Sequence, residues 1–347
     1  MNRASELPET MTAAVTLRHG GPDAVEVRRD WPVPRPGAGE VLVRVAAAAV
    51  NNTDLWARRG AYGRPGDPDA VAGWKGVPLR FPLIQGIDIA GMVVQVGDGV
   101  DDDWVGRRVI VDPAARYEDG VPADVAGSET DGGFAEFHRC SVAQCHDVGG
   151  SRLSDAQLAC LPTAYGTAMG MINRAGCRDG ERVLVTGSSG GVGSAAIQLL
   201  VGRGCHVIAY TSASKADLVR SWGPAEIVVR SPTALASVDP VDVVVDVVGG
   251  DEFGALVDRL RTGGRLVTAG AIAGPVVSLD LRQLYLQQRR IIGSTLHTAG
   301  DFADLVAMAA ATGVAPTVAA TYPLEEIRAA QERFEAKDFT GKLVLVP

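Results

Sequence analysis

Hydrophobic positions in the first part of the chain form short runs that are broken by turn residues. Between residues 11 and 148, apolar and β-branched residues dominate four stretches, 13–17, 41–50, 89–96 and 108–111, and helical spacing is scarce. Runs of this length between glycines and prolines are typical of strands. The pattern therefore predicts a β-rich first part of the molecule.

One long irregular segment interrupts these strands. Residues 62–81 contain closely spaced glycines and prolines together with Trp74, and they show no periodicity. Loops of this length in a compact domain often act as lids or binding loops. We expect a surface loop here that contributes to substrate specificity.

After about residue 154 the pattern changes, because helical spacing begins to alternate with short buried runs. Strands are predicted at 182–185, 206–210, 226–229, 243–247, 265–269 and 290–293. Helices are predicted at 155–161, 166–173, 194–203, 215–222, 253–260, 281–288 and 301–312. Six strands with crossover helices predict a doubly wound parallel sheet. A last strand at 342–346 is expected to return to the first domain.

The turn between the strand at 182–185 and the next helix carries the strongest local signal. Gly187, Gly190 and Gly193 recur there at every third residue, and Ser188 stands at the first glycine position of the common G-x-G-x-x-G pattern. Glycines let the backbone approach a pyrophosphate closely, and the N–H groups at the helix start attract its charge. The turn predicts a dinucleotide site, with an ordinary strand-to-helix turn as the alternative.

The end of the second predicted strand of this sheet bears on the choice of dinucleotide. An acidic residue there would bind the ribose hydroxyls and repel a 2′-phosphate. The chain instead has Thr211, Ser212, Ser214 and Lys215, whose hydroxyls and ammonium suit a phosphate monoester. This favours NADPH over NADH, unless Ser214 only caps the following helix and Lys215 is only solvated.

Composition excludes several classes of protein. The 347 residues, of which 46% are hydrophobic, are enough for two domains. A net charge of −8 and 5% aromatic residues argue against a nucleic-acid partner, which needs a basic face and stacking platforms. No stretch approaches the ~20 apolar residues of a membrane span. We expect residues 1–10, which are polar, to form a flexible extension.

The cysteines indicate the redox environment. Five are present, an odd number, and none forms a C-x-x-C pair. A disulfide framework or a thiolate zinc site is therefore not expected, and a cytoplasmic location fits best.

Taken together, the motifs resemble the medium-chain dehydrogenase/reductase superfamily, and in particular its zinc-independent quinone oxidoreductase branch. The resemblance extends from residue 11 to 347 and rests on the order and spacing of nine segments. They are GEVLVRV (39–45), VNNTD (50–54), GIDIAG (86–91), VVQVG (93–97), GRRV (106–109), GGFAE (132–136), LPTAYGTA (161–168), VVDVVG (244–249) and GKLV (341–344).

The resemblance implies an architecture of two domains with an active site in the cleft between them. Residues 11–155, joined by the returning segment 313–347, would form a GroES-like catalytic domain. Residues 156–312 would form a Rossmann domain that binds NADPH. Members of this family commonly pair through the edge of the Rossmann sheet, so a homodimer is expected, and residues 265–274 are a candidate part of that interface.

Zinc-dependent members of the family bind catalytic zinc through cysteine and histidine at three positions. This chain has Asn51, Ile87 and Thr163 there, and it has no cysteine between residues 112 and 127, where a structural zinc lobe would lie. Zinc prefers thiolate, imidazole or carboxylate ligands. No metal site is therefore predicted, although the carboxylates of Asp54 and Asp88 are nearby.

Without zinc, reduction of an acceptor that is already electrophilic is easier than oxidation of a simple alcohol. The expected reaction is NADPH-dependent hydride transfer to a quinone or an activated enone. By resemblance, Asn51 and Asp54 would lie near the nicotinamide, with Asn51 donating to a substrate oxygen, and Tyr62 would supply a phenol. An alternative for Asn51 and Asp54 is that they only order the turn after a strand. The branch often has an aromatic residue where this chain has Asn52, which suggests a more polar pocket.

The remaining candidates concern the cofactor. Thr167 would contact the nicotinamide carboxamide or a phosphate, His297 is a weaker candidate for the cleft, and Trp56 is expected in the core. The predicted cofactor residues are Thr167, Gly187, Ser188, Gly190, Gly191, Val192, Gly193, Thr211, Ser212, Lys215, Val247, Gly270 and Lys342. Two other functions stay open, an alcohol dehydrogenase with divergent zinc ligands and a non-catalytic NADPH-binding protein of crystallin type.

Overall fold

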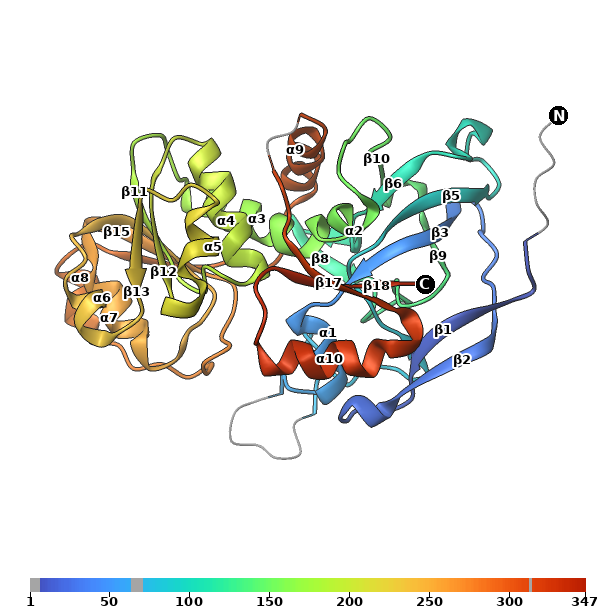
Figure 1. Ribbon diagram of the computed structural model, residues 1–347, viewed down its shortest axis with the longest axis horizontal. Coiled ribbons are helices and arrows are strands. Elements are labelled where there is room, and N and C mark those ends of the chain that lie inside the picture. The colour runs from blue at the N-terminus through green and yellow to red at the C-terminus, as the bar shows by residue number, and fades with distance from the viewer. Residues whose placement is uncertain (1–6, 64–70, 312–313) are drawn as a thin grey trace.

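The computed structural model describes residues 7–63, 71–311 and 314–347 and shows an elongated molecule, with a parallel sheet at one end and antiparallel strands at the other (Figure 1). Parts of three predicted features lie outside the described residues: residues 1–6 of the extension, residues 64–70 of the loop, and residues 312–313 at the predicted end of the Rossmann domain. Of the predicted extension 1–10, Glu9 O accepts a hydrogen bond from Val33 N at 3.0 Å and Thr10 begins a strand.

The antiparallel end consists of three sheets. The largest has the strand order β10-β6-β5-β3-β18-β17, and β9 also pairs with β3. Its strands are β3 (Glu40–Ala49), β5 (Ala90–Val96), β6 (Arg108–Val111), β9 (Phe137–Ser141), β10 (Cys145–Asp147), β17 (Val318–Pro323) and β18 (Lys342–Val346). The smaller sheets are β2-β1-β4, with β1 (Thr10–Thr16), β2 (Val25–Pro32) and β4 (Leu83–Ile84), and the hairpin β7 (Ala114–Glu118) with β8 (Val121–Val125). The end of the chain thus joins the first part of the molecule, since β18 pairs with β3.

The parallel sheet has the order β13-β12-β11-β14-β15-β16, and all of its pairings are parallel. Its strands are β11 (Arg182–Val185), β12 (His206–Thr211), β13 (Glu226–Val229), β14 (Val241–Asp246), β15 (Leu260–Thr268) and β16 (Arg290–Gly293). The order reverses between β11 and β14, and ligands of such sheets bind in the crevice at that point. The predicted doubly wound sheet is confirmed.

Helices cover both faces of this sheet. Because side chains of a strand alternate between faces, Val183 and Val185 of β11 pack in one core cluster and Leu184 packs in another. The helices of the described chain are α1 (Asn52–Arg59), α2 (Asp155–Leu158), α3 (Gly166–Ala175), α4 (Gly191–Gly202), α5 (Ala216–Arg220), α6 (Pro232–Ala236), α7 (Phe253–Asp258), α8 (Leu281–Tyr285), α9 (Ala299–Ala310) and α10 (Ile327–Ala336). A π-helical turn, Leu161–Tyr165, precedes α3.

The largest core cluster connects the two ends of the molecule. It contains Val183 of the parallel sheet together with Ala49 and Val344 of the antiparallel sheet, and all three are fully buried. This shared core therefore joins the parallel sheet to β3 and β18. Among the described residues, no helix is long and apolar enough to cross a membrane.

The sequence pattern missed three helices, α1, α6 and α10, and it missed α1 and α10 for a common reason. Each buries a polar side chain where an apolar one would mark the inner face: Arg58 in α1 and Gln331 in α10, which hydrogen-bond to each other. The hydrophobic period that identifies a helix is therefore interrupted in both. The predicted domain boundaries at 155 and 312 stay predictions.

Candidate functional site

Two cavities lie on either side of the glycine turn, and both open at the carboxyl edge of the parallel sheet. The first, of about 350 Å³, lies between the two ends of the molecule and is bounded by α1, the π-helical turn, α3, the start of α4 and the residues after β16. The second, of about 370 Å³, lies beside β12. Gly187 lines both cavities, so a single extended ligand can pass over the turn from one to the other.

The turn itself has the geometry that close ligand approach requires. Gly187 has φ +56°, which favours glycine, and a Cβ on Gly193 would lie 2.2 Å from Gly187 O. The turn therefore depends on the absence of side chains, and it points the first N–H groups of α4 toward the cavities. Ser188 is fully buried and donates to Val185 O at 2.7 Å, which ties the turn to the end of β11.

The predicted cofactor residues fall into two groups in space. Eight line the first cavity: Thr167, Gly187, Gly190, Gly191, Val192, Gly193, Val247 and Gly270. Five line the second cavity: Gly187, Ser188, Thr211, Ser212 and Lys215. Only Lys342 of the predicted set lines neither cavity.

The second cavity collects cationic side chains from distant parts of the chain. Lys215, which follows β12, donates to the carbonyl oxygens of Lys337 and Phe339 at 3.0 and 2.9 Å. Arg230 and Lys337 line the same cavity, and Glu252 adds one carboxylate. Sequence reasoning missed Arg230 and Lys337, because neither belongs to the strand-turn-helix motif that identified Lys215.

The surroundings of Lys337 shift the pKa of its ammonium strongly. Partial burial, together with the charges of Lys342, Lys215 and Arg59, lowers the pKa of Lys337 to about 8. Its ammonium donates to Asn52 Oδ1 at 2.8 Å, so it connects the second cavity to a residue that lines the first.

Lys342 lies beneath the floor of the first cavity, which corrects its prediction as a direct cofactor contact. Its buried ammonium donates to Val50 O at 3.0 Å, to Asp88 Oδ2 at 3.1 Å and to Asn51 Oδ1. Three acceptors satisfy the three N–H groups of an ammonium. The side chain is thus committed to an interior ion pair with Asp88, which is itself fully buried.

Asn51 lines the first cavity, but its amide is also engaged. Its Nδ2 group donates to Ala49 O at 3.2 Å and to Asp88 Oδ2 at 2.9 Å, while its Oδ1 accepts from Lys342. Both N–H bonds are therefore in use. The expectation that Asn51 donates to a substrate oxygen stays a prediction, and it requires one of these two hydrogen bonds to break.

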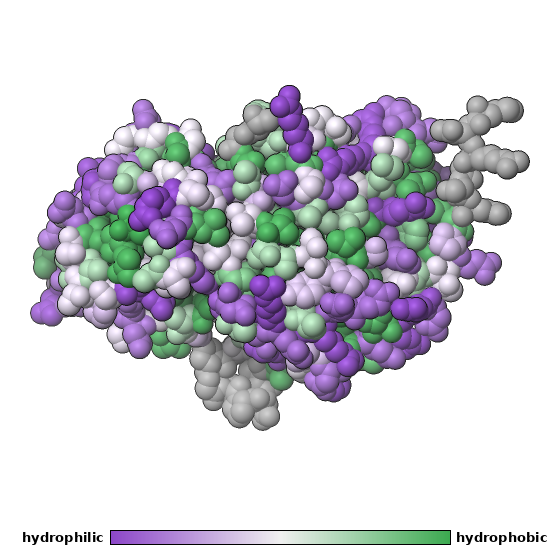
Figure 2. Space-filling view, viewed as in Figure 1, coloured by the Kyte–Doolittle hydropathy of each residue, from purple (hydrophilic) through white to green (hydrophobic). Residues whose placement is uncertain are grey.

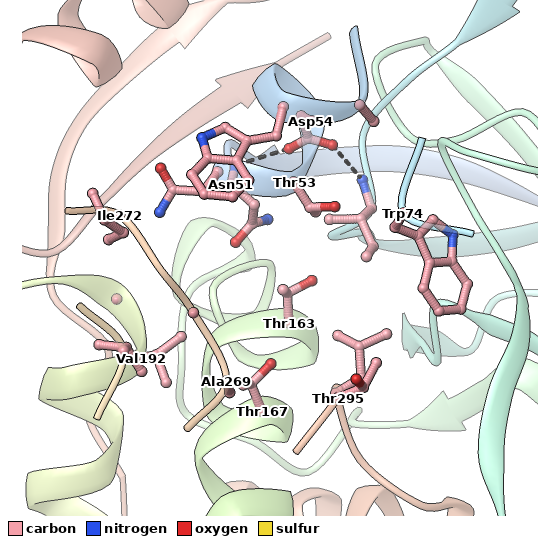
Figure 3. A pocket seen from close by; sticks show the side chains of 18 of the residues that line it. Asn51, Thr53, Asp54, Trp74, Thr163, Thr167, Val192, Ala269, Ile272 and Thr295 are labelled. Atoms are coloured by element: carbon pink, nitrogen blue, oxygen red, sulfur yellow. Dashed lines mark hydrogen bonds between the residues drawn. The ribbon is translucent and has the colours of Figure 1, made fainter. Parts of the chain in front are cut away.

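Asp54 lies beside Asn51 at the start of α1 (Figure 3). Its carboxylate accepts from Asn51 N at 2.8 Å and from Ile87 N at 3.3 Å, so it orders the turn between β3 and α1. Burial raises the pKa of Asp54 to about 7, with a smaller contribution from Asp88, and these two backbone hydrogen bonds oppose the shift. The arrangement supports the ordering role that the sequence left as an alternative.

Aromatic side chains form one side of the first cavity. Tyr62 donates to Thr53 Oγ1 at 3.1 Å, and its ring meets that of Trp56 at a centroid distance of 5.6 Å. Trp74, from the predicted loop, also lines the cavity, and its Nε1 donates to Glu129 at 3.0 Å. Trp56 therefore belongs to the cavity wall, whereas the sequence placed it in the core.

The three positions that carry zinc ligands in zinc-dependent relatives converge on the first cavity, as Asn51, Ile87 and Thr163 all line it. Asp88 Oδ1 accepts from Thr163 N at 2.7 Å, which fixes the π-helical turn to the buried ion pair. The Thr163 hydroxyl has no hydrogen-bond partner among the described residues. In the described part of the chain, no three histidine, cysteine or acidic side chains are placed to hold a metal ion together.

His297 is fully buried outside both cavities, which corrects its expected place in the cleft. Its Nε2 atom lies 3.1 Å from Asp112 Oδ1, so the pair joins the segment after β16 to the segment before β7. The residues just before it, Thr295 and Leu296, do line the first cavity. His297 thus follows two residues of the cavity wall but does not line the cavity itself.

Comparisons with known proteins agree with this architecture. Residues 37–150 match the family model of the alcohol dehydrogenase GroES-like domain, and residues 191–311 match that of zinc-binding dehydrogenases. An acryloyl-coenzyme A reductase of Metallosphaera sedula is 32% identical, with 90% of this chain and 93% of the relative covered. The quinone oxidoreductase of Mus musculus is 28% identical, with 97% and 98% covered.

A solved structure has the same fold. The structure of a presumed alcohol dehydrogenase of Sinorhizobium meliloti has a TM-score of 0.94 and 44% identity, with 98% of both chains covered. Both family models and the relative of 32% identity, which matches nine-tenths of the chain, indicate the same family. The chain belongs to the medium-chain dehydrogenase/reductase superfamily.

Proposed function

We propose that the chain is an NADPH-dependent, zinc-independent oxidoreductase that transfers hydride to a quinone or an activated enone. The observation that carries this proposal is the pair of cavities joined across the glycine turn. One cavity collects cations suited to a phosphate, and the other is walled by aromatic side chains. The relatives named above bear the names of enzymes for both kinds of acceptor, an acryloyl-coenzyme A reductase and a quinone oxidoreductase.

The fit of NADPH is supported by features of the chain itself. A Cβ on Gly270 would lie 2.9 Å from Val247 O, so this wall too is open to close approach only because it lacks a side chain. The buried hydroxyl of Thr211 has no partner among the described residues and faces a cavity that also contains Lys215, Arg230 and Lys337. In this proposal these groups hold the 2′-phosphate, which carries close to two negative charges at neutral pH.

The first cavity suits a conjugated carbonyl acceptor. Trp56, Tyr62 and Trp74 supply flat apolar surface, and Val192 and Ile272 lie across the cavity from Trp74 (Figure 3). An acceptor of this class can delocalise the charge that hydride addition creates, so it needs less assistance from a metal. The nicotinamide ring of the bound cofactor supplies the hydride.

Zinc independence is supported by the groups at the three ligand positions. Asn51, Ile87 and Thr163 include no thiolate, imidazole or carboxylate. Of the two carboxylates that contact these positions, Asp88 is paired with the ammonium of Lys342, and Asp54 accepts from the backbone N–H groups of Asn51 and Ile87. A divalent cation here would have to bind beside a buried positive charge, which is unfavourable in a medium of low dielectric constant.

The test follows NADPH oxidation at the nicotinamide absorbance with a panel of quinones and enones. Parallel samples use NADH in place of NADPH, and a metal chelator. We expect turnover that prefers NADPH and survives the chelator. Loss of activity with the chelator would favour an alcohol dehydrogenase with divergent ligands, and tight NADPH binding without reduction of any acceptor would favour a binding protein.

A further inference from the structure

We propose that the hydroxyl of Thr163 is a catalytic hydrogen-bond donor to the carbonyl oxygen of the acceptor. This inference rests on the proposed enone reduction and names the group that replaces the metal in it. Thr163 lies in the π-helical turn Leu161–Tyr165, its side chain lines the first cavity, and the residue is only 8% exposed. Figure 3 shows it between Asn51 and Thr167, on the same wall as Thr167.

The hydroxyl of Thr163 is free to take this role. Its Oγ1 atom is buried without a hydrogen-bond partner among the described residues. A buried hydroxyl left without a partner is destabilising. An acceptor oxygen that enters the cavity and receives this hydrogen bond recovers that free energy, so the site favours a ligand with a carbonyl at this point.

The two donors that the sequence predicted are already in use. Asn51 donates to Ala49 O and Asp88, and the phenol of Tyr62 donates to Thr53. Neither can donate to the acceptor without breaking an existing hydrogen bond. Thr163, at a position where zinc-dependent relatives have a metal ligand, lines the same cavity, and its hydroxyl has no existing hydrogen bond to break.

A hydrogen bond to Asp88 fixes the backbone of Thr163. Asp88 Oδ1 accepts from Thr163 N at 2.7 Å, and Asp88 Oδ2 accepts from Lys342 at 3.1 Å and from Asn51 at 2.9 Å. The buried ion pair therefore positions the π-helical turn. The β-branched side chain has few rotamers, so a fixed backbone also restricts where the hydroxyl can point. Preorganised donors of this kind stabilise charge that develops during a reaction.

The chemistry assigns each electron pair. The hydride, which the C4–H bond of the reduced nicotinamide would supply as that ring is oxidised, bonds to the β-carbon of the enone. The π electrons of the C=C bond form the new double bond of an enolate, and the carbonyl π electrons become the third lone pair of its oxygen. The Thr163 hydroxyl donates a hydrogen bond to that oxygen and keeps its proton. When the enolate collapses, its α-carbon takes a proton from solvent water, which gives the saturated carbonyl compound.

The test compares Thr163→Val, which removes the hydroxyl at nearly constant volume, with Thr163→Ser, which keeps it. Removing one preorganised donor typically costs about 10²–10³ in rate. We expect kcat for an enone to fall roughly 100-fold in Thr163→Val, with KM changed little, and to stay within about fivefold of wild type in Thr163→Ser. Thr321→Val, on the exposed side of β17, is the matched control and should keep wild-type activity.

A second readout does not depend on turnover. The infrared carbonyl frequency of an isotope-labelled enone, bound together with the oxidised cofactor, reports the hydrogen bond directly. In wild type it should lie below the value in an apolar solvent, and in Thr163→Val it should return toward that value. If Thr163→Val does not fold, Thr163→Ala, which also removes the hydroxyl, replaces it in both measurements.

The outcomes separate this inference from the proposed function. A wild-type protein that reduces enones, with equal kcat and carbonyl frequency in Thr163→Val, overturns the role of Thr163 and leaves the proposed function standing. An unshifted carbonyl frequency in wild type has the same meaning. A wild-type protein that reduces none of the enones overturns the proposed reduction, and the inference with it.

Discussion

At the scale of single residues, the buried carboxyl of Asp54 predicts a pH-dependent contribution to stability. Its pKa is raised to about 7 by burial, against about 4 in an unfolded chain. Because the folded state binds this proton more tightly, the contribution is complete below about pH 4 and is lost as the pH rises through 7. Asp54→Asn removes the titration. Its stability relative to wild type, from urea unfolding, should therefore rise between pH 4 and pH 8.

The control for Asp54→Asn is Asp304→Asn, which removes an exposed carboxyl from α9. Its difference from wild type should change less over the same pH range. If the difference between Asp54→Asn and wild type stays constant from pH 4 to pH 8, the carboxyl does not titrate in this window. The backbone hydrogen bonds from Asn51 and Ile87 then outweigh the effect of burial.

Lys337 predicts a pH dependence of cofactor affinity. Its pKa is lowered to about 8, whereas the 2′-phosphate of NADPH stays charged above pH 7. If Lys337 binds this phosphate, the Kd for NADPH rises between pH 7 and pH 9 as the ammonium loses its proton. Lys337→Gln should weaken NADPH binding roughly tenfold at pH 7 and flatten the pH profile. Calorimetric titration measures both effects.

NADH and a second lysine provide the controls for Lys337. NADH lacks the 2′-phosphate, so its affinity should change little with Lys337→Gln. Lys75→Gln removes a surface lysine that pairs with Asp124 outside both cavities, and it should leave both affinities unchanged. Equal weakening of NADH and NADPH would assign Lys337 to the shared pyrophosphate and not to the 2′-phosphate.

At the scale of elements, α4 contains two glycines with opposite expected effects. In Gly193→Ala the new Cβ would lie 2.2 Å from Gly187 O, so the turn has to move. We expect a loss of about 1–3 kcal/mol in the free energy of unfolding, and at least tenfold weaker NADPH binding. Gly202→Ala, at the end of the same helix, meets no atom within 4 Å and should stabilise the protein by about 0.5–1 kcal/mol.

These two variants are checked by thermal unfolding and by NADPH titration. Because both substitutions are glycine to alanine in one helix, helix propensity is matched and only the contact with the turn differs. If Gly193→Ala binds NADPH as tightly as wild type, the turn adapts to the new side chain. The cofactor's pyrophosphate then does not bind at this position.

The element scale also shows where sequence patterns were sufficient. The strands of the parallel sheet are buried on both faces and the glycine turn is a local motif, so each could be identified within a short window. The helices α1 and α10 could not, because Arg58 donates a hydrogen bond to Gln331 across 273 residues of sequence. A polar pair of this kind interrupts both helical patterns, and neither segment alone reveals its partner.

At the scale of the whole molecule, the exposed edge of the parallel sheet predicts a homodimer. The strand β16 ends the sheet, and Figure 2 shows apolar side chains exposed at the left-hand end of the molecule, where Figure 1 places α8 and β15. Leu281, Tyr285 and Leu286 of this region are each 64% exposed. The sequence candidate 265–274 is corrected in part, since β15 lies inside the sheet and β16 forms its edge.

Sedimentation velocity tests this interface. Wild type should sediment as a dimer at micromolar concentration, and the double variant Leu281→Glu and Leu286→Glu should sediment as a monomer, because burying two carboxylates at an interface is costly. Val105→Glu is the control, since it places the same charge on an exposed apolar position at the antiparallel end. A monomeric wild type would contradict the predicted dimer.

The sequence alone determined the features that depend on neighbouring residues. It identified the alternation of strands and helices, the turn at Gly187 and Gly193, and the hydroxyls and lysine after β12. Each of these is set by backbone preferences or by side chains within a few positions of one another, so a single sequence is sufficient to recognise it.

Only the tertiary structure decided which of these groups are available for chemistry. Lys342 reaches Asp88 across 254 residues of sequence, and that ion pair occupies the amide of Asn51 and holds the backbone of Thr163. Folding also brings Lys337 to the cavity that contains Lys215. The physical reason is that a buried polar group needs a hydrogen-bond partner, and that partner can come from a residue distant in sequence that folding brings close.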